Sequence, residues 1–177
     1  PNTEGLRDFH DQGELKKLLT GLNKIKNEKK IECPIAIKIS PDIKDDEISK
    51  IVELVSSHNI KGIVVSNTTD SNRNNLSDTK KNEIGGLSGQ PLKDISTNLI
   101  KRFYKETKGK IKIIGVGGVD SGQSAYEKIT AGANAVQLYT GMVYKGPGIV
   151  KEIKKDLISI LKKENIKNIS EAVGINA

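Results

Sequence analysis

The stretch KIIGVGGVDSG (residues 112–122) decides the fold class of this chain. It begins with a short run of Ile and Val, continues through paired glycines, and ends in Asp-Ser-Gly, which is typical of the start of a helix. An apolar strand that passes through a glycine loop into a helix is the repeating unit of α/β proteins with parallel sheets. The stretch therefore predicts a buried parallel strand, a close-fitting loop and a following helix.

The same pattern recurs along the chain. Three further runs are nearly continuous in apolar residues and predict strands covered on both faces: PIAIKIS (34–40), GIVVSN (62–67) and AVQLYT (135–140). Apolar residues spaced three and four apart predict helices over 13–29, 44–57, 92–106, 122–131 and 148–163. Alternating strands and helices with short connections favour parallel strands joined by right-handed crossovers.

Four strands, each followed by a helix, make half of a (β/α)8 TIM barrel, and no domain boundary interrupts residues 1–177. The strand ends are polar or glycine-rich, whereas the opposite ends are plain, so the site is expected at the carboxyl ends of the strands. A doubly wound open sheet is the competing fold. It too places its ligands at the carboxyl ends of strands.

Composition narrows the class of protein. Only 3% of the 177 residues are aromatic and there is no Trp, so the core must consist of Ile, Leu, Val and Ala. The formal charge of +7 could indicate nucleic acid, but the lysines alternate with acids and lack interleaved aromatics, so no nucleic-acid partner is expected. Cys33, the only cysteine, excludes an internal disulfide and is expected to be a buried or half-buried structural residue.

Three glycine-rich segments follow predicted strands or precede predicted helices: GGLSG (85–89), GVGGVDSG (115–122) and LYTG (138–141). Glycine lets the backbone approach a ligand closely, and the N-terminus of a following helix offers free N–H groups to an anion. In barrels, the last two strand-to-helix loops often bind phosphate. Together these segments predict a phosphate or nucleotide-phosphate site.

Two polar features stand at the ends of the first two strands. Lys38 lies inside an apolar strand, either as a solvated strand-end residue or as a fixed cation that faces an anion in the barrel mouth. SNTT (66–69) supplies an amide and hydroxyls that could orient a small polar ligand or could simply cap the strand. No metal-ligand spacing, P-loop or glycosidase-type acid pair is present, and Asp42 and Asp120 are interpreted as helix-start residues.

Six motifs occur in an order and spacing that resemble a known family. They are PNTEGLR (1–7), AIKISPD (36–42), VVSNTT (64–69), GGLSGQPL (85–92), IIGVGGVDSG (113–122) and AGANAVQLYTG (131–141). Together they resemble the C-terminal half of dihydroorotate dehydrogenase of the quinone-dependent class. The resemblance extends from Pro1 to about Gly174.

The resemblance implies an FMN-dependent enzyme of de novo pyrimidine biosynthesis that oxidises (S)-dihydroorotate to orotate, with quinone as the electron acceptor. In this family a base removes a proton from C5, and hydride leaves C6 for FMN. The resemblance implies that the N-terminal half of the barrel and any membrane-docking helices lie outside this chain. It also implies a peripheral location on the bacterial inner membrane, at its cytoplasmic face, or on the mitochondrial inner membrane.

The resemblance also implies roles for individual residues. The catalytic base, a Ser in this class, is expected immediately before Pro1, and Thr3 could belong to its proton path. Asn2, Asn67 and Thr68 would bind the substrate.

For FMN, Lys38 would place positive charge near N1 and O2 of the flavin, and Ser66 and Ser88 would add polar contacts. The phosphate would be held by Gly89, Gly117, Gly118, Tyr139 and Thr140. Two other hypotheses stay open, namely an FMN barrel that acts on a different ring and a non-catalytic phosphate-binding half-barrel.

Overall fold

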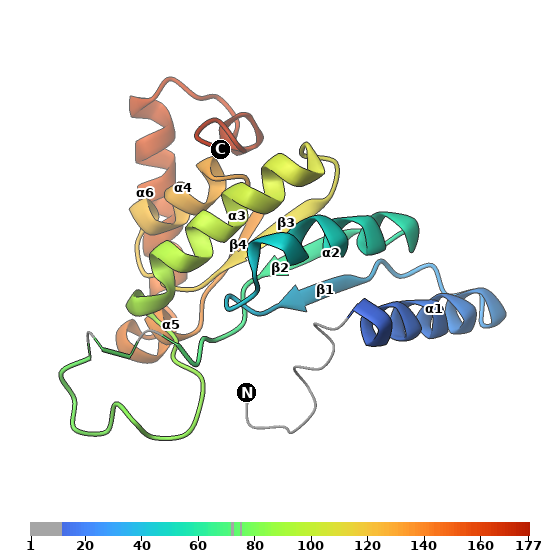
Figure 1. Cartoon of the computed structure of the whole chain (residues 1–177). Coiled ribbons are helices and arrows are strands. Elements are labelled where there is room, and N and C mark those ends of the chain that lie inside the picture. Colours follow the sequence, from blue (N-terminus) through green and yellow to red (C-terminus); the bar gives the residue numbers. More distant parts are fainter. Residues whose placement is uncertain (1–11, 72, 75) are drawn as a thin grey trace.

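The computed structural model describes residues 12–71, 73–74 and 76–177, which form four parallel strands and the helices that connect them (Figure 1). The strands are β1 (Ala36–Ile39), β2 (Gly62–Val65), β3 (Lys112–Val116) and β4 (Ala135–Gln137). Their order in the sheet, β1-β2-β3-β4, is their order in the chain. Each crossover therefore advances by one strand in the same direction, as in a barrel wall, whereas a doubly wound sheet reverses direction at its switch point.

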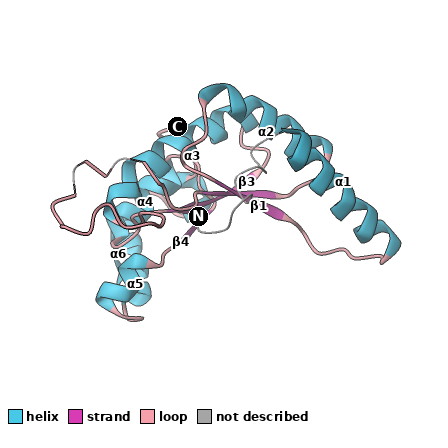
Figure 2. Cartoon of the chain, turned by 60° about the horizontal axis from the view of Figure 1, so that its bottom comes forward, coloured by secondary structure: helices cyan, strands magenta, loops and turns pink. Residues whose placement is uncertain are grey.

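The larger helices lie on one side of this sheet (Figure 2). They are α1 (Gln12–Glu28), α2 (Asp45–Ser57), α3 (Lys93–Thr107), α4 (Gly122–Thr130) and α6 (Ile149–Lys163). The short elements are α5 (Thr140–Lys145) and two single 3-10 turns, η2 (Gln90–Leu92) and η3 (Ile169–Ala172). The predicted long helices are thus confirmed to within one or two residues at each end.

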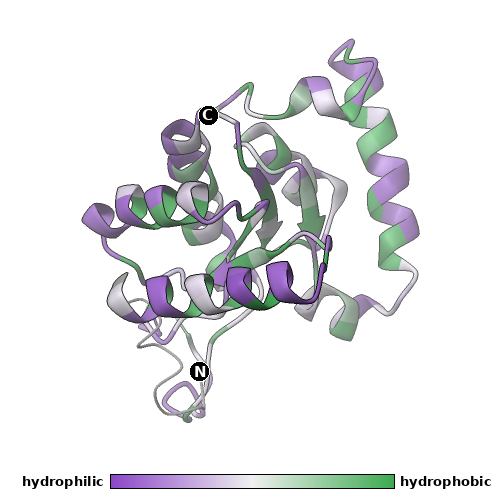
Figure 3. Ribbon diagram, turned by 90° about the vertical axis from the view of Figure 1, so that its right-hand side faces the viewer, coloured by the Kyte–Doolittle hydropathy of each residue, from purple (hydrophilic) through white to green (hydrophobic). Residues whose placement is uncertain are grey.

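The core lies between the sheet and the helices, where apolar residues gather (Figure 3). Its fully buried members include Leu19, Val55, Ile63, Ile100 and Ile113. Phe103 is the largest of the fully buried side chains, and the rest of the main cluster is aliphatic apart from the flanking Tyr104. The aliphatic core expected from the composition is confirmed.

The second face of the sheet differs from the prediction. The strands were expected to be covered on both faces, but Lys38 is exposed and Val64 and Ile114 are only half-buried. Within β1, Ile39 is buried on the helix side while Lys38 points to the opposite face. In a closed barrel this opposite face lines the interior, which explains why the strands carry apolar residues on both sides.

The strand predicted over 135–140 is too long. β4 pairs with β3 only from Ala135 to Gln137, and the chain then turns into the unpredicted helix α5. Tyr139 caps this helix, since its carbonyl accepts hydrogen bonds from the N–H groups of Met142 and Val143. Thr140 is therefore the first residue of a helix and not the end of a strand.

Three smaller predictions were also wrong. Cys33 is exposed on the segment that enters β1. Asp120 precedes the true N-cap of α4, Ser121, whose hydroxyl accepts from the Ser124 N–H. Asp42 caps no helix, because its carboxylate instead accepts hydrogen bonds from two hydroxyls at the start of the next long loop.

Candidate functional site

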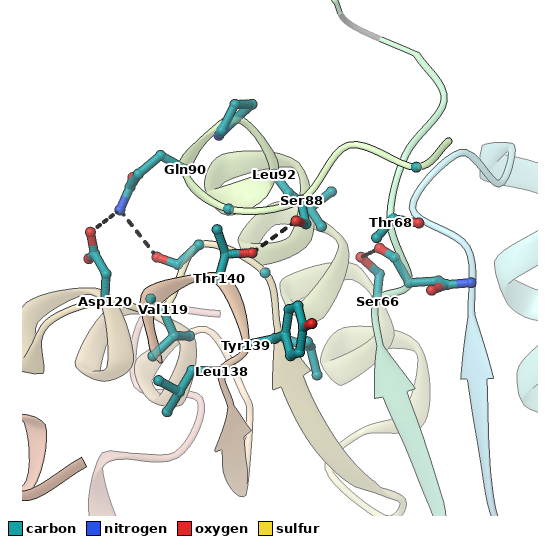
Figure 4. A pocket seen from close by; sticks show the side chains of 18 of the residues that line it. Ser66, Thr68, Ser88, Gln90, Leu92, Val119, Asp120, Leu138, Tyr139 and Thr140 are labelled. Carbon is teal, nitrogen blue, oxygen red and sulfur yellow. Dashed lines mark hydrogen bonds between the residues drawn. The ribbon is translucent and has the colours of Figure 1, made fainter. Parts of the chain in front are cut away.

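A cavity of about 680 Å³ opens at the carboxyl ends of the four strands (Figure 4). Every strand contributes to it through its last residues or the loop that follows. It lies on the edge of the sheet at which (β/α)8 barrels carry their chemistry. A cavity thus opens at the edge of the sheet where the sequence predicts the site.

The cavity brings together all the predicted site residues that the structure describes. They are Lys38, Ser66, Asn67, Thr68, Ser88, Gly89, Gly117, Gly118, Tyr139 and Thr140. They come from five separate segments of the chain, which the parallel topology places side by side. Asn2 and Thr3 lie outside the described residues.

One end of the cavity, which we call the glycine end, consists of Gly89, Gly117, Gly118 and Thr140. Gly118 has φ of +69°, and a Cβ atom there would lie 2.5 Å from Lys93 Cβ. Gly89 has φ of +82°, and its Cβ would lie 3.0 Å from Thr140 Cγ2. These glycines are required both by the backbone conformation and by the contact between neighbouring loops.

The glycine end presents unused backbone donors. Within the described ranges, the N–H groups of Gly118, Val119, Thr140 and Gly141 find no hydrogen-bond acceptor, and all four residues line the cavity. Backbone N–H groups left without partners at a loop and at the first turn of a helix suit an anion. The glycine end therefore has the chemistry of a phosphate cradle.

Side-chain hydrogen bonds join the loops around this end (Figure 4), and three of the residues that form them, Gln90, Asp120 and Lys145, were not among the predicted site residues. Gln90 Nε2 donates to Asp120 Oδ2 over 2.6 Å, and Lys145 Nζ donates to the Asp120 carbonyl over 3.0 Å. The hydroxyls of Ser88 and Thr140 are 2.8 Å apart. Gln90 and Asp120 lie within motifs quoted above, so their motif positions were the one available signal for them.

The other end, which we call the lysine end, consists of Lys38, Ser66, Asn67 and Thr68. Its backbone is fixed to the sheet, because the Ser66 N–H donates to the Val116 carbonyl and the Asn67 N–H donates to the Ile39 carbonyl. Its side chains are less well satisfied. Lys38 is exposed, and Thr68 Oγ1 is buried without a hydrogen-bond partner in the part of the chain described.

The unpaired Thr68 hydroxyl points to a function at the lysine end. A buried hydroxyl without a partner costs roughly 1–3 kcal/mol, so it is uncommon unless a ligand or a water supplies the missing bond. Among the described residues, no three His, Cys, Asp or Glu side chains lie close enough together to hold a metal ion. The site offers an anion cradle at one end and, at the other, polar side chains that include the unpaired Thr68 hydroxyl.

No helix in the described ranges is both long enough and apolar enough to cross a membrane.

Comparisons with known proteins agree with this geometry. The family model described as dihydroorotate dehydrogenase matches residues 1–161. The chain is 45% identical to dihydroorotate dehydrogenase (quinone) of Trichodesmium erythraeum, covering 99% of this chain and 47% of that protein. It is 39% identical to the mitochondrial dihydroorotate dehydrogenase (quinone) of Mus musculus, covering 99% and 45%.

Solved structures give the same result. A crystal structure of the Eimeria tenella enzyme, in complex with ferulenol, superposes with a TM-score of 0.91 at 34% identity, covering 99% of this chain and 51% of that one. Such relatives are TIM barrels, so the four strands and their helices correspond to part of one barrel. The chain spans about half the length of the curated relatives it matches. By its sequence and by its fold, the chain belongs to the dihydroorotate dehydrogenase family, among the relatives of the quinone-dependent class.

Proposed function

We propose that this chain supplies the FMN-binding half of a (β/α)8 barrel that oxidises dihydroorotate to orotate and passes the electrons to a quinone. The observation that carries the proposal is a cavity with two unlike ends, one an anion cradle and the other a set of polar side chains. The names of the relatives supply the reaction. On this proposal the rest of the barrel lies outside the chain and completes the site.

The glycine end would hold the phosphate of FMN. The unpaired N–H groups of Gly118 and Thr140 would donate to its oxygens, and the Thr140 hydroxyl, already oriented by Ser88, would add a further donor. Gly89, Gly117 and Tyr139 would shape the cradle. When bound, FMN supplies the acceptor for the hydride that leaves the substrate.

The lysine end would face the flavin ring and the substrate. Lys38 carries a cation on the barrel-interior face of β1, where it would stabilise negative charge without rearrangement. Asn67 and Thr68 would hydrogen-bond the pyrimidine and carboxylate of the substrate, together with Asn2. Ser66 would add a polar contact to the flavin, while Thr3 and a Ser base before Pro1 would move the C5 proton.

Quinone binding and peripheral contact with a bacterial inner or mitochondrial inner membrane would belong to segments outside this chain. Both follow from the proposed family activity, since the relatives include bacterial and mitochondrial quinone enzymes.

The site favours this function over a bare phosphate-binding half-barrel, because such a protein has no need of Lys38, Asn67 and Thr68 at the far end of the cavity. An FMN barrel with another ring substrate differs only in the ligand at the lysine end. The experiment must therefore determine which ring compound binds at the lysine end.

The test uses the intact protein in two steps. Its visible absorption spectrum should show about one flavin per chain, and orotate, but not uracil, should perturb that spectrum at saturation. A colourless protein would contradict the FMN assignment, and a flavin spectrum indifferent to orotate would favour another substrate. Anaerobic addition of dihydroorotate should then bleach the flavin, and a quinone should restore it.

A further inference from the structure

We propose that Lys128 is a positioning residue that holds the loops of the glycine end from below and adds a buried positive charge beneath it. This inference rests on the proposed FMN phosphate site. Lys128 belongs to α4, outside the cavity lining, and α3 and α4 pack side by side on the sheet (Figure 1).

Lys128 is fully buried, with 0% of its surface exposed. Its ammonium donates to three groups at the start of α3, each at hydrogen-bond distance. They are the Lys93 carbonyl at 3.3 Å, Ser96 Oγ at 3.1 Å and Thr97 Oγ1 at 3.1 Å. All three ammonium protons are thus accounted for, and the side chain is fixed in one place.

Ser96 connects Lys128 to the sheet through hydrogen bonds. Because its oxygen accepts from Lys128, its own proton is left for the carbonyls of Val65 at 3.2 Å and Val116 at 2.5 Å. Val65 and Val116 are the last residues of β2 and β3, and Val116 lies directly before Gly117. A short chain of hydrogen bonds therefore joins Lys128 to the strand end from which the glycine loop departs.

The second route runs through Lys93. This residue begins α3, directly after the turn that carries Gly89 and Gln90 into the cavity. The backbone of Lys93 packs against Gly118, where any Cβ atom would collide with it. By holding the Lys93 carbonyl, Lys128 fixes the position of the Gly89 loop relative to the Gly118 loop.

The charge of Lys128 is poorly compensated. Burial and, to a smaller extent, the Lys93 ammonium lower its pKa to about 8, while Glu127 and Asp94 oppose the shift. Glu127 is itself paired with Lys93 over 2.7 Å. These three are the charged groups that act on Lys128 from α3 and α4. Toward the sheet it reaches two uncharged groups, the strand-end carbonyls of Val65 and Val116, through Ser96.

A phosphate dianion in the cradle would compensate the positive charge of Lys128. Its binding would favour the ammonium and raise the pKa of Lys128. By linkage, FMN should bind tightly below pH 8, where free Lys128 is already charged, and more weakly as the pH rises through 8, because binding then requires proton uptake. A purely structural lysine would give no such dependence.

The experiment measures the FMN dissociation constant of the intact apoprotein, by flavin fluorescence, from pH 7 to 9.5, where the FMN phosphate is already a dianion. In the parent protein the constant should rise about tenfold over this range. Lys128→Met should bind about tenfold more weakly at pH 7 and show a flat profile. Lys93→Met removes a repelling cation, so it should move the midpoint to higher pH, while the exposed Lys105→Met on α3 should match the parent.

The possible results distinguish the proposed function from the inference about Lys128. A parent that binds no FMN at any pH overturns the proposed function and this inference with it. A parent that binds FMN with a flat profile overturns this inference alone, whether or not Lys128→Met folds. A circular dichroism melt of each variant accompanies the titration, and a Lys128→Met protein that folds and keeps parental affinity and pH profile also overturns it.

Discussion

The glycine end and the lysine end of the cavity are built in different ways. The glycine end is made of backbone, and its three loops are joined to one another by the Ser88–Thr140 and Gln90–Asp120 hydrogen bonds. The lysine end is made of side chains from β1 and from the segment directly after β2, where hydrogen bonds to neighbouring strands already hold the backbone. At the glycine end, the same loops hold the fold together and would bind the ligand. At the lysine end, the backbone holds the fold and the side chains would bind the ligand.

This difference predicts two patterns of mutational effect. Changes at the glycine end should alter stability and flavin binding together, because the loops pack against α3 and against one another. Changes at the lysine end should alter chemistry or substrate binding and leave the fold intact, because Lys38 is exposed and Asn67 is held through its backbone. The following variants test this contrast.

Gly118→Val should have the largest effect. The variant must adopt φ of +69° and place a Cβ atom 2.5 Å from Lys93 Cβ. The backbone strain costs roughly 1–3 kcal/mol and crowding a similar amount, so we expect a lower unfolding free energy and loss of bound flavin. Urea unfolding and flavin content would measure the two effects.

Gly146→Val is the matched control for Gly118→Val. Gly146 has a similar φ of +72°, but nothing lies within 4 Å of its Cβ position, and it is outside the cavity lining. The Gly146→Val variant should lose stability through backbone strain alone and should keep its bound flavin. A Gly118→Val protein that retains full flavin and parental stability would refute the close packing of the glycine end.

Lys38→Ala should spare the fold and slow the chemistry. Loss of a fixed charge that faces the developing negative charge typically costs roughly 3–4 kcal/mol in the barrier, or about 10²–10³ in rate. Lys38→Arg should rescue only in part, because the guanidinium cannot act as a compact point charge. Anaerobic single-turnover reduction by saturating dihydroorotate, in the intact enzyme, measures the rate.

Lys112→Ala is the control for charge alone, since Lys112 is exposed at the opposite end of the sheet, on β3. It should reduce its flavin at the parent rate. If Lys38→Ala does so as well, Lys38 is a solvated strand-end residue and the lysine end has no catalytic cation.

The sequence was sufficient to predict the glycine end because its determinants are local. Each glycine loop follows its own strand or precedes its own helix, and the barrel topology then requires the loops to meet at one edge. The hydrophobic spacing likewise located the long helices, since periodicity depends only on neighbouring residues.

Residues defined by distant contacts were not predictable. The role of Asp42 depends on hydroxyls 27 and 29 positions away, and the burial of Lys128 depends on acceptors 31 to 35 positions away. In the sequence, Lys128 resembles any lysine on an amphipathic helix. Helix α5 was missed because the apolar run through Leu138 continues past the last paired residue of β4.

Asn67→Ala should weaken orotate binding and leave FMN content nearly unchanged. Removing one partner from a buried polar contact costs roughly 1–3 kcal/mol, or about 5- to 150-fold in the dissociation constant. Titration with orotate, followed by the flavin spectrum, would measure it, with the exposed Asn98→Ala on α3 as control. Loss of flavin with unaltered orotate affinity would mean that the two ligand assignments are interchanged.

Substitutions in the Ser88–Thr140 pair should have the smallest effect on FMN binding. They also provide the most direct test of whether the loops act together. Either Ser88→Ala or Thr140→Val removes one hydroxyl of a pair 2.8 Å apart, and should weaken FMN binding by roughly 0.5–1.5 kcal/mol, or about 2- to 12-fold. Once one hydroxyl is gone, the other loses its orienting partner, so the double variant should lose less than the sum of the two.

The double-mutant cycle is measured by FMN titration of the four apoproteins, and Ser159→Ala is the control, because that hydroxyl bonds only within α6, to the Lys155 carbonyl. A coupling energy of about 0.5 kcal/mol or more would show that the loops after β2 and β4 bind the phosphate as one unit. Strict additivity would mean that each hydroxyl acts alone. The glycine end would then resemble the lysine end, a set of independent side chains, and the contrast between the two ends would rest on the glycines only.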